Sequence, residues 1–161
     1  MKWLALITAA FVLVAAALPA AADDGSDTAS IRHLMMATFD KPEAPLTVEP
    51  VTIHGDVAVA GWSQGDMGGR ALLRRKDGSW TLTLCSGDAL KEAASLRTFG
   101  LSEADAEALA TAVVAAEAGI DPALVAKFSA FDGVVMMSSD GSHPPAEGHG
   151  HDHGAAAQQT H

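Results

Sequence analysis

The spacing of hydrophobic residues changes several times along the chain, and each change marks an expected element. Ile31, Leu34 and Met35 recur at the spacing of one helix face, which predicts a helix over residues 27–39 that ends before Pro42. The next stretch alternates apolar and polar residues and is rich in β-branched side chains, as half-buried strands are. The expected strands are residues 47–54, 57–63, 70–76 and 79–85, joined by tight turns at 55–56 and 77–78 and by a flexible glycine-rich connection at 65–69.

Single residues add two details to these strands. Pro50 has no backbone N–H, so the first strand should lie at a sheet edge or carry a bulge. Strict alternation in the fourth strand would place Cys85 on the face opposite to Trp80 and Leu82. The four strands are therefore expected to form an antiparallel meander with one face packed on helices.

Three helical segments are expected after the strands, over residues 88–99, 102–118 and 121–128. Gly100 suits the end of the first helix, Ser102 is a typical N-cap of the second, and Pro122 suits the first turn of the third. The apolar residues within 131–135 are expected to pack back as the last ordered piece. This order predicts an α+β domain with an N-terminal helix, a four-stranded antiparallel meander and two to three C-terminal helices, for which the half-open cone of cystatin-like or NTF2-like folds is a plausible arrangement.

The two ends of the chain differ in composition from the domain between them. Residues 1–22 carry a lysine, then an apolar run of about 16 residues, too short to span a bilayer, and then small residues, which predicts a cleavable signal peptide. The exported chain is thus expected in the periplasm, with no stable membrane anchor. Residues 138–161 contain no Leu, Ile, Val or Phe, which predicts a flexible His-rich tail after a single domain at 23–137.

Charge and cysteine content narrow the classes of function. Acidic residues outnumber basic ones 20 to 10, for a formal net charge of -10. An electrostatic nucleic-acid binder needs a basic surface, so that class is excluded, and attraction to anionic lipid is disfavoured. One cysteine excludes an intramolecular disulfide framework.

The tail carries the strongest chemical signal in the sequence. Neutral imidazole binds metal ions, and histidines at alternate positions bring several donors together at low entropic cost. Such nitrogen and oxygen donors suit Cu(II), Ni(II) and Zn(II), so the predicted cofactor is copper, with zinc or nickel as alternatives. A solvated polar tail is the other interpretation. The tail ligands are His143, His149, His151, His153 and His161.

Sulfur side chains form a second group of candidate ligands. Thioethers favour Cu(I) and need no deprotonation. Met35 lies on the apolar helix face and is assigned to the core, and His54 is expected at the surface. Cys85 is a buried structural thiol, a copper ligand or one half of a disulfide with another chain. The candidate ligands within the domain are His33, Met36, Met67, Cys85, Met136 and Met137.

Enzyme signatures are weak in this chain. The sequence contains no G-x-S-x-G, P-loop or H-E-x-x-H motif, and nothing in it pairs Cys85 with a histidine. A hydrolase or isomerase on an NTF2-like frame would need an Asp/His pair inside a cavity. The expectation is therefore a protein that is not an enzyme.

Three blocks of the sequence carry a resemblance to a known family. They are IRHLMMATFDKP at 31–42, GWSQGDMGGRALLRRKDG at 61–78 and LCSGD at 84–88. With these blocks the chain resembles the copper uptake system-associated proteins, which are small exported proteins of proteobacteria. The resemblance covers residues 30–100, the signal peptide and the His-rich tail. It implies a role beside a periplasmic copper chaperone or a copper importer of the outer or inner membrane, and it transfers no metal site residue by residue.

Two functions of different classes follow from these observations. The first is a copper-binding accessory protein of a copper uptake system, which captures or buffers copper through the tail and through Met or Cys ligands. The second is a domain that binds a small ligand or a partner and carries an incidental metal-binding tail. For the second, Trp62 and Trp80 are the candidate walls of a pocket between sheet and helices.

Overall fold

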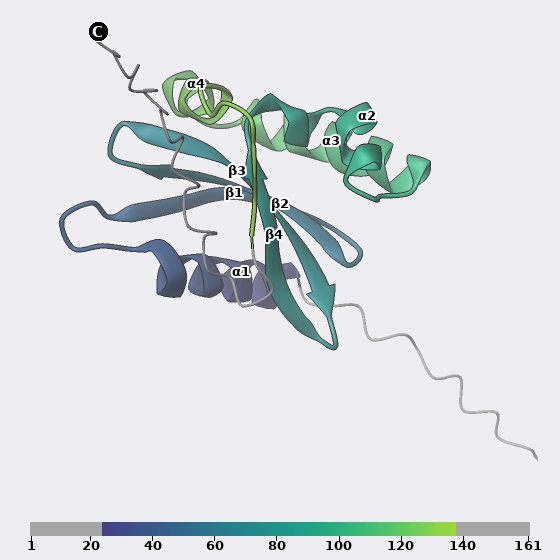
Figure 1. The fold of residues 1–161 in the computed structure, drawn as a ribbon, viewed down its shortest axis with the longest axis horizontal. Helices are drawn as coiled ribbons and strands as arrows, with labels where there is room; N and C mark the ends of the chain where they lie inside the picture. The colour runs from purple at the N-terminus through teal and green to yellow at the C-terminus, as the bar shows by residue number, and fades with distance from the viewer. Residues whose placement is uncertain (1–23, 138–161) are drawn as a thin grey trace, which may run out of the picture.

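A computed structural model describes residues 24–137 as one sheet with helices on both faces (Figure 1). The predicted signal peptide and the His-rich tail lie outside the described residues. The elements are α1 (Asp24–Phe39), β1 (Leu46–His54), β2 (Val57–Gln64), β3 (Met67–Lys76), β4 (Ser79–Ser86), the 3₁₀ turn η1 (Asp88–Lys91), α2 (Ala93–Thr98), α3 (Glu103–Glu117), α4 (Pro122–Ser129) and β5 (Val134–Met136). None of the helices in this part of the chain is long and apolar enough to cross a membrane.

The sheet is antiparallel throughout and its strands follow the order β1-β2-β3-β4-β5. The α+β class, the N-terminal helix, the meander and the C-terminal helices are confirmed. The prediction of four strands is one short, because Val134–Met136 pairs with the outer edge of β4 as a fifth strand. Three residues are too few to produce a recognisable alternation in a sequence.

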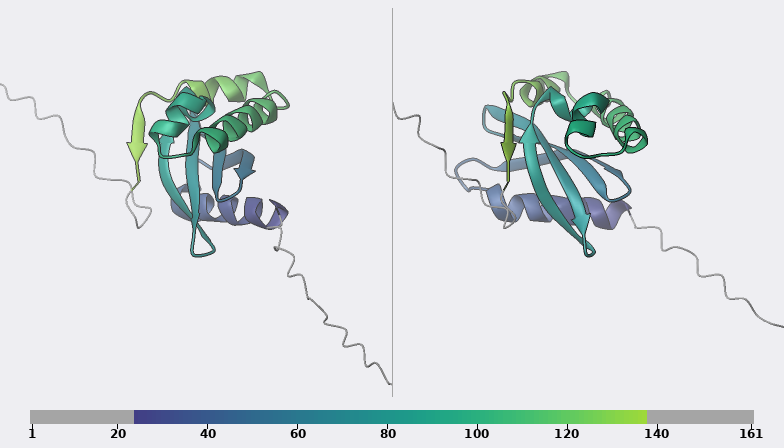
Figure 2. Two further views of the ribbon diagram at one scale, coloured as in Figure 1. Left: turned by 90° about the vertical axis from the view of Figure 1, so that its right-hand side faces the viewer. Right: turned by 45° about the vertical axis from the view of Figure 1, so that its right-hand side comes forward.

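Helices cover both faces of the sheet, so the prediction of a single packed face is wrong (Figure 2). Helix α1 lies on one face, and α2, α3 and α4 form a layer on the other. In β3, Ala71 and Leu73 belong to the core under α1, whereas Leu72 belongs to the core under the helical layer. A strand with apolar residues at consecutive positions is typical of a sheet buried on both sides.

A β-bulge in β4 overturns the predicted orientation of Cys85. Leu72 pairs with Leu84 and Leu73 with Leu82, so Thr83 is an extra residue with no partner in β3. An extra residue shifts the alternation by one position. Cys85 consequently points to the same face as Leu82, into the core under α1, and Leu84 points to the opposite core.

The other local signals are confirmed with small changes. β1 is an edge strand with an irregularity between Val48 and Val51, where Pro50 follows a cis peptide bond. The turn at Asp77 and Gly78 has positive φ at both residues, as a two-residue hairpin turn requires. β3 already begins at Met67, so the expected flexible connection at 65–69 is reduced to a turn.

The helix boundaries follow their predicted caps. The Ser102 hydroxyl accepts a hydrogen bond from the Asp105 N–H, and the Asp121 carboxylate accepts one from the Ala123 N–H. The segment predicted as one helix over residues 88–99 is divided at Glu92 into η1 and α2. This division lets both Leu90 and Leu96 reach the same core.

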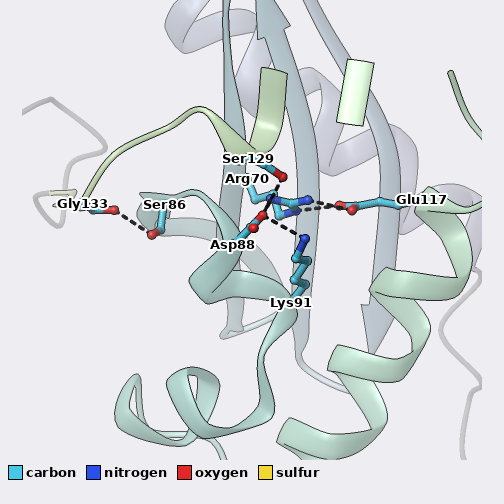
Figure 3. Close-up of polar contacts among 7 residues, drawn as sticks. All are labelled: Arg70, Ser86, Asp88, Lys91, Glu117, Ser129 and Gly133. Carbon is cyan, nitrogen blue, oxygen red and sulfur yellow. Dashed lines mark hydrogen bonds and ion pairs between the residues drawn. The ribbon is translucent and has the colours of Figure 1, made fainter. Parts of the chain in front are cut away.

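A buried ionic cluster joins the sheet to the helical layer (Figure 3). The guanidinium of Arg70 in β3 is fully buried and donates to both carboxylate oxygens of Glu117 in α3, at 2.6 and 2.7 Å. It also donates to Asp88 at 3.1 Å, and Asp88 in turn accepts from Ser129 at 2.6 Å. Desolvation alone would raise the pKa of Asp88, but the hydrogen bonds from Ser129 and Lys91 and the positive charges of Lys91 and Arg70 hold it below its ordinary value. The cluster therefore ties β3, η1, α3 and α4 together.

Candidate functional site

A cavity of about 250 Å³ lies on the α1 face of the sheet, near the ends of β2, β3 and β5. Its volume exceeds the roughly 30 Å³ that one water molecule occupies in the liquid, so an ion or a small molecule fits without displacement of side chains. Aromatic and aliphatic groups form most of the wall. The lining residues are Met35, Phe39, Leu46, Trp62, Gln64, Met67, Cys85, Phe131, Val135 and Met137.

Four of these lining residues carry sulfur. Met35 comes from α1, Met67 from the first position of β3, Cys85 from β4, and Met137 directly follows β5. Met35 and Cys85 are buried, at 2% and 6% exposure, whereas Met67 is 64% exposed. Two sulfurs therefore lie in the interior, and Met67 lies at the solvent side of the cavity.

The bulge at Thr83 positions two of these sulfurs. It turns Cys85 toward α1, as described above. Its carbonyl oxygen also accepts a hydrogen bond from the Met137 N–H at 2.9 Å, which holds the chain after β5 against β4. Cys85 pairs with Val135, so Met137 lies two residues further along the same side of β5.

Glycine in β3 makes room for the aromatic wall. Trp62 pairs across the strands with Gly69, and a Cβ at Gly69 would lie 2.9 Å from the Trp62 ring and 2.8 Å from the Phe131 ring. Trp62 and Phe131 meet edge to face, with ring centroids 5.9 Å apart. The glycines at 68–69, predicted as part of a flexible connection, are thus strand residues packed under other groups.

The loop between α1 and β1 is fixed beside the cavity by two polar side chains. The Gln64 amide donates to the carbonyl oxygens of Phe39 and Ala44, at 2.8 and 2.7 Å. The Asp40 carboxylate accepts from the Leu46 N–H at 2.7 Å. These hydrogen bonds hold Phe39 and Leu46 in place, and no charged side chain from the described part of the chain lines the cavity.

The Cys85 thiol is strongly held in its protonated form. Burial raises its pKa to about 12, because a thiolate loses solvation in an apolar surrounding. The Trp62 indole N–H acts in the opposite direction, since it lies close enough to the sulfur to favour the thiolate. That contact falls outside normal hydrogen-bond geometry, so the buried Nε1 of Trp62 has no full partner among residues 24–137.

We expect Cys85 of the metal-free protein to react with iodoacetamide at pH 8 at least about 1000-fold more slowly than in the unfolded chain, because only the thiolate reacts. Mass spectrometry of samples quenched at intervals measures the rate, and the same protein in guanidinium chloride is the control. Comparable rates in the two conditions would show that the thiol is neither buried nor shifted in its pKa.

The structure brings together some of the predicted ligands and separates others. Met67, Cys85 and Met137 line one cavity, together with Met35, whose predicted place in the core under α1 is confirmed. His33 and Met36 are exposed on α1 and do not line it. Met136 is 56% exposed and points away from it. The histidines at 143, 149, 151, 153 and 161 lie outside the described residues.

The remaining candidates have structural roles. His54 is partly exposed and lies 3.2 Å from the Asp105 carboxylate. Trp80 donates its indole N–H to Asp27 and stacks under Arg75, so of the two expected pocket walls only Trp62 lines the cavity. Cys85 is buried, which disfavours a disulfide with another chain and leaves the structural thiol and the copper ligand as its two open interpretations. Within residues 24–137, no three His, Cys, Asp or Glu side chains gather as a metal site.

Comparisons of the chain with protein family models, with curated proteins and with solved structures gave no match. The chemistry of the cavity is therefore the basis for a functional assignment. One thiol and three thioethers are soft donors, which suit Cu(I) better than they suit hard cations. The apolar remainder of the wall also suits a small apolar ligand.

Proposed function

We propose that the protein is an exported copper-binding accessory of a copper uptake system, and that its folded domain binds Cu(I) in the sulfur-lined cavity. The observation that carries this proposal is the convergence of Met35, Met67, Cys85 and Met137 on one cavity. The four residues come from four different parts of the chain, and only the fold brings them together. The proposed role is not enzymatic.

The chemistry of Cu(I) fits this wall. Thioether sulfur binds without losing a proton, so Met35, Met67 and Met137 offer neutral donors at any pH. Among residues 24–137, no ammonium or guanidinium group lines the cavity to repel a cation. When Cys85 binds as thiolate, its proton leaves to water, and the unpaired Trp62 N–H is available to the sulfur.

The tail supplies a second set of donors in this proposal. Its histidines suit capture of Cu(II), with zinc or nickel as competing ions. Periplasmic location and a copper chaperone or importer as partner belong to the same proposal. The signal-peptide pattern and the resemblance to the copper uptake system-associated proteins support them. A cystatin-like or NTF2-like fold is also part of the proposal; the antiparallel sheet without crossovers and the packing of α1 on one of its two helix-covered faces support it.

A second candidate function is the binding of a small apolar ligand with one hydrogen-bond acceptor. Two observations favour it: the wall is mainly apolar, and the buried Trp62 N–H has no full partner among the described residues. This ligand would occupy the same cavity as copper, so the two functions can be distinguished by the same variants.

Replacing Met67 or Met137 with leucine is expected to weaken Cu(I) binding by about 10- to 100-fold, because leucine keeps the volume and removes the sulfur. The test uses the exported chain, residues 23–161, with all five tail histidines replaced by alanine, so that the cavity alone is measured. Competition with a chromogenic Cu(I) chelator under anaerobic reducing conditions gives the affinity.

Met136→Leu is the matched control, since Met136 adjoins Met137 and points away from the cavity. Its affinity should stay within about twofold of the parent. Absence of Cu(I) binding in the histidine-free parent would refute a copper site in the domain. Binding of an apolar dye tests the second candidate function, a site for a small apolar ligand. That function would be favoured if all variants bound Cu(I) with equal affinity while Met67→Leu and Met137→Leu lost dye binding.

A further inference from the structure

Met67 differs from the other sulfur residues of the cavity in its access to solvent. It is 64% exposed, whereas Met35 and Cys85 are buried and Met137 is half-buried. All four residues line the same cavity. A small reagent that arrives from solvent therefore reaches the Met67 sulfur more readily than any other sulfur of the cavity.

The turn that carries Met67 is held in place from both faces of the sheet. Met67 pairs with Gln64 across this turn, and the Gln64 amide donates to two carbonyl oxygens of the segment 39–44, between α1 and β1. From the other face, the Lys127 ammonium in α4 donates to the carbonyl oxygen of Gly65 at 2.9 Å. These bonds fix the backbone at Met67, so its exposure comes from its place at the edge of the cavity and not from an unattached loop.

An accessible thioether is oxidised by peroxides to methionine sulfoxide. The sulfur lone pair attacks one oxygen of hydrogen peroxide, the O–O bond breaks and an S–O bond forms. The other oxygen leaves as hydroxide and takes the proton of the newly bound oxygen to form water. Sulfur is oxidised and the peroxide is reduced, so the reaction needs no further reactant. Buried thioethers and buried thiols react more slowly, because susceptibility follows exposure.

Oxidation changes Met67 from a suitable ligand into an unsuitable one. The sulfur of a sulfoxide is electron-poor and its oxygen is a hard donor, so neither atom replaces the soft thioether as a ligand for Cu(I). The S–O group is also strongly polar, and its transfer from water to the mainly apolar wall of the cavity is unfavourable. A sulfoxide at Met67 therefore removes one donor from the site and favours a side chain turned toward solvent.

We infer that Met67 is a modification site of this protein, and that its oxidation by peroxide weakens the binding of Cu(I) in the cavity. The effect on copper rests on the proposed function, whereas the selective oxidation of Met67 follows from its exposure. Met35 and Cys85 are buried and keep their reduced sulfur, so one ligand is lost and the interior of the site is preserved. Methionine sulfoxide reductases return the sulfoxide to the thioether, which makes the change reversible.

The first measurement compares the oxidation rates of single methionines in the metal-free protein. The exported chain 23–161, with all five tail histidines replaced by alanine, is treated with hydrogen peroxide, and peptide mass spectrometry with fragmentation assigns each oxidised residue over time. Met67 should react at least about 10-fold faster than Met35. The exposed Met36 and Met136 should react as well, but they lie outside the cavity. Equal rates for Met67 and Met35 would overturn the inference.

The second measurement is the Cu(I) affinity of the same chain, by chelator competition, before and after peroxide treatment and removal of the peroxide. Oxidation should weaken binding by at least about 10-fold, and methionine sulfoxide reductases should restore it. Met67→Leu is the matched control, because Met36 and Met136 are oxidised in both proteins. Its affinity after oxidation should stay within about twofold of its own untreated value.

The outcomes separate this inference from the proposed function. Unchanged affinity after complete oxidation of Met67, or an equal loss of affinity in the oxidised Met67→Leu chain, would overturn the inference. Absence of Cu(I) binding before any treatment would instead refute the proposed function and, with it, the effect of oxidation on copper. The oxidation rates would in that case still decide whether Met67 is the modification site.

Discussion

Replacing Cys85 with serine is expected to weaken Cu(I) binding in the cavity by at least about 100-fold, measured by chelator competition in the histidine-free chain. Serine is nearly the same size, but its hydroxyl is a hard donor and a poor ligand for Cu(I). The thioethers of Met67 and Met137 remain in this variant, so residual binding at lower affinity is expected.

Measuring proton release on Cu(I) binding shows whether Cys85→Ser weakens binding by removing the thiolate ligand or by altering the shape of the cavity. The pKa of the Cys85 thiol is about 12, so at neutral pH the thiol is protonated and must lose its proton to bind as thiolate. Cu(I) binding should therefore release one proton and strengthen as pH rises, by up to about tenfold per pH unit. The Cys85→Ser variant should release none. Unchanged affinity in this variant would show that copper does not bind Cys85.

Replacing Glu117 with leucine is expected to destabilise the fold by about 3–5 kcal/mol. The change removes the carboxylate that accepts two hydrogen bonds from the fully buried Arg70 guanidinium. Asp88 stays within 3.1 Å of Arg70, but its side chain is 45% exposed and compensates less. Urea denaturation followed by circular dichroism measures the free energy of unfolding.

Two further variants test whether the loss arises from an unpaired buried charge. Glu107 is exposed on the same helix, so Glu107→Leu should change stability by no more than about 0.5 kcal/mol. The double variant with Arg70→Met and Glu117→Leu removes both charges and should recover most of the loss, because burial of the ion pair is itself costly. A double variant as unstable as Glu117→Leu alone would contradict this explanation.

Much of the fold could be predicted because its signals are local. Turn residues specify the hairpins. Ser102 and Asp121 cap their helices through hydrogen bonds to residues of the same helix. Pro50 lacks a backbone N–H, which places its strand at an edge or gives it a bulge in any sheet. The short strand β5 could not be predicted, because three residues gain their structure from the edge of β4 rather than from their own pattern.

The candidate site was predictable as a list of sulfur residues and not as a cluster. Met67, Cys85 and Met137 were identified by side-chain chemistry, which a sequence shows directly. Met35 was assigned to the core, because its place on the apolar helix face is the same whether it borders a cavity or not. Met36 and Met136 have the same chemistry but point elsewhere.

The sequence by itself determined the elements, the turns and the types of donor atom, since each depends on residues within a few positions of one another. Only the tertiary structure decided which donors meet. The bulge at Thr83 reverses the direction of Cys85, and the register of β5 carries Met137 to the same cavity. Both features depend on pairing between distant segments, in which a shift of one residue moves a side chain to the other face of the sheet.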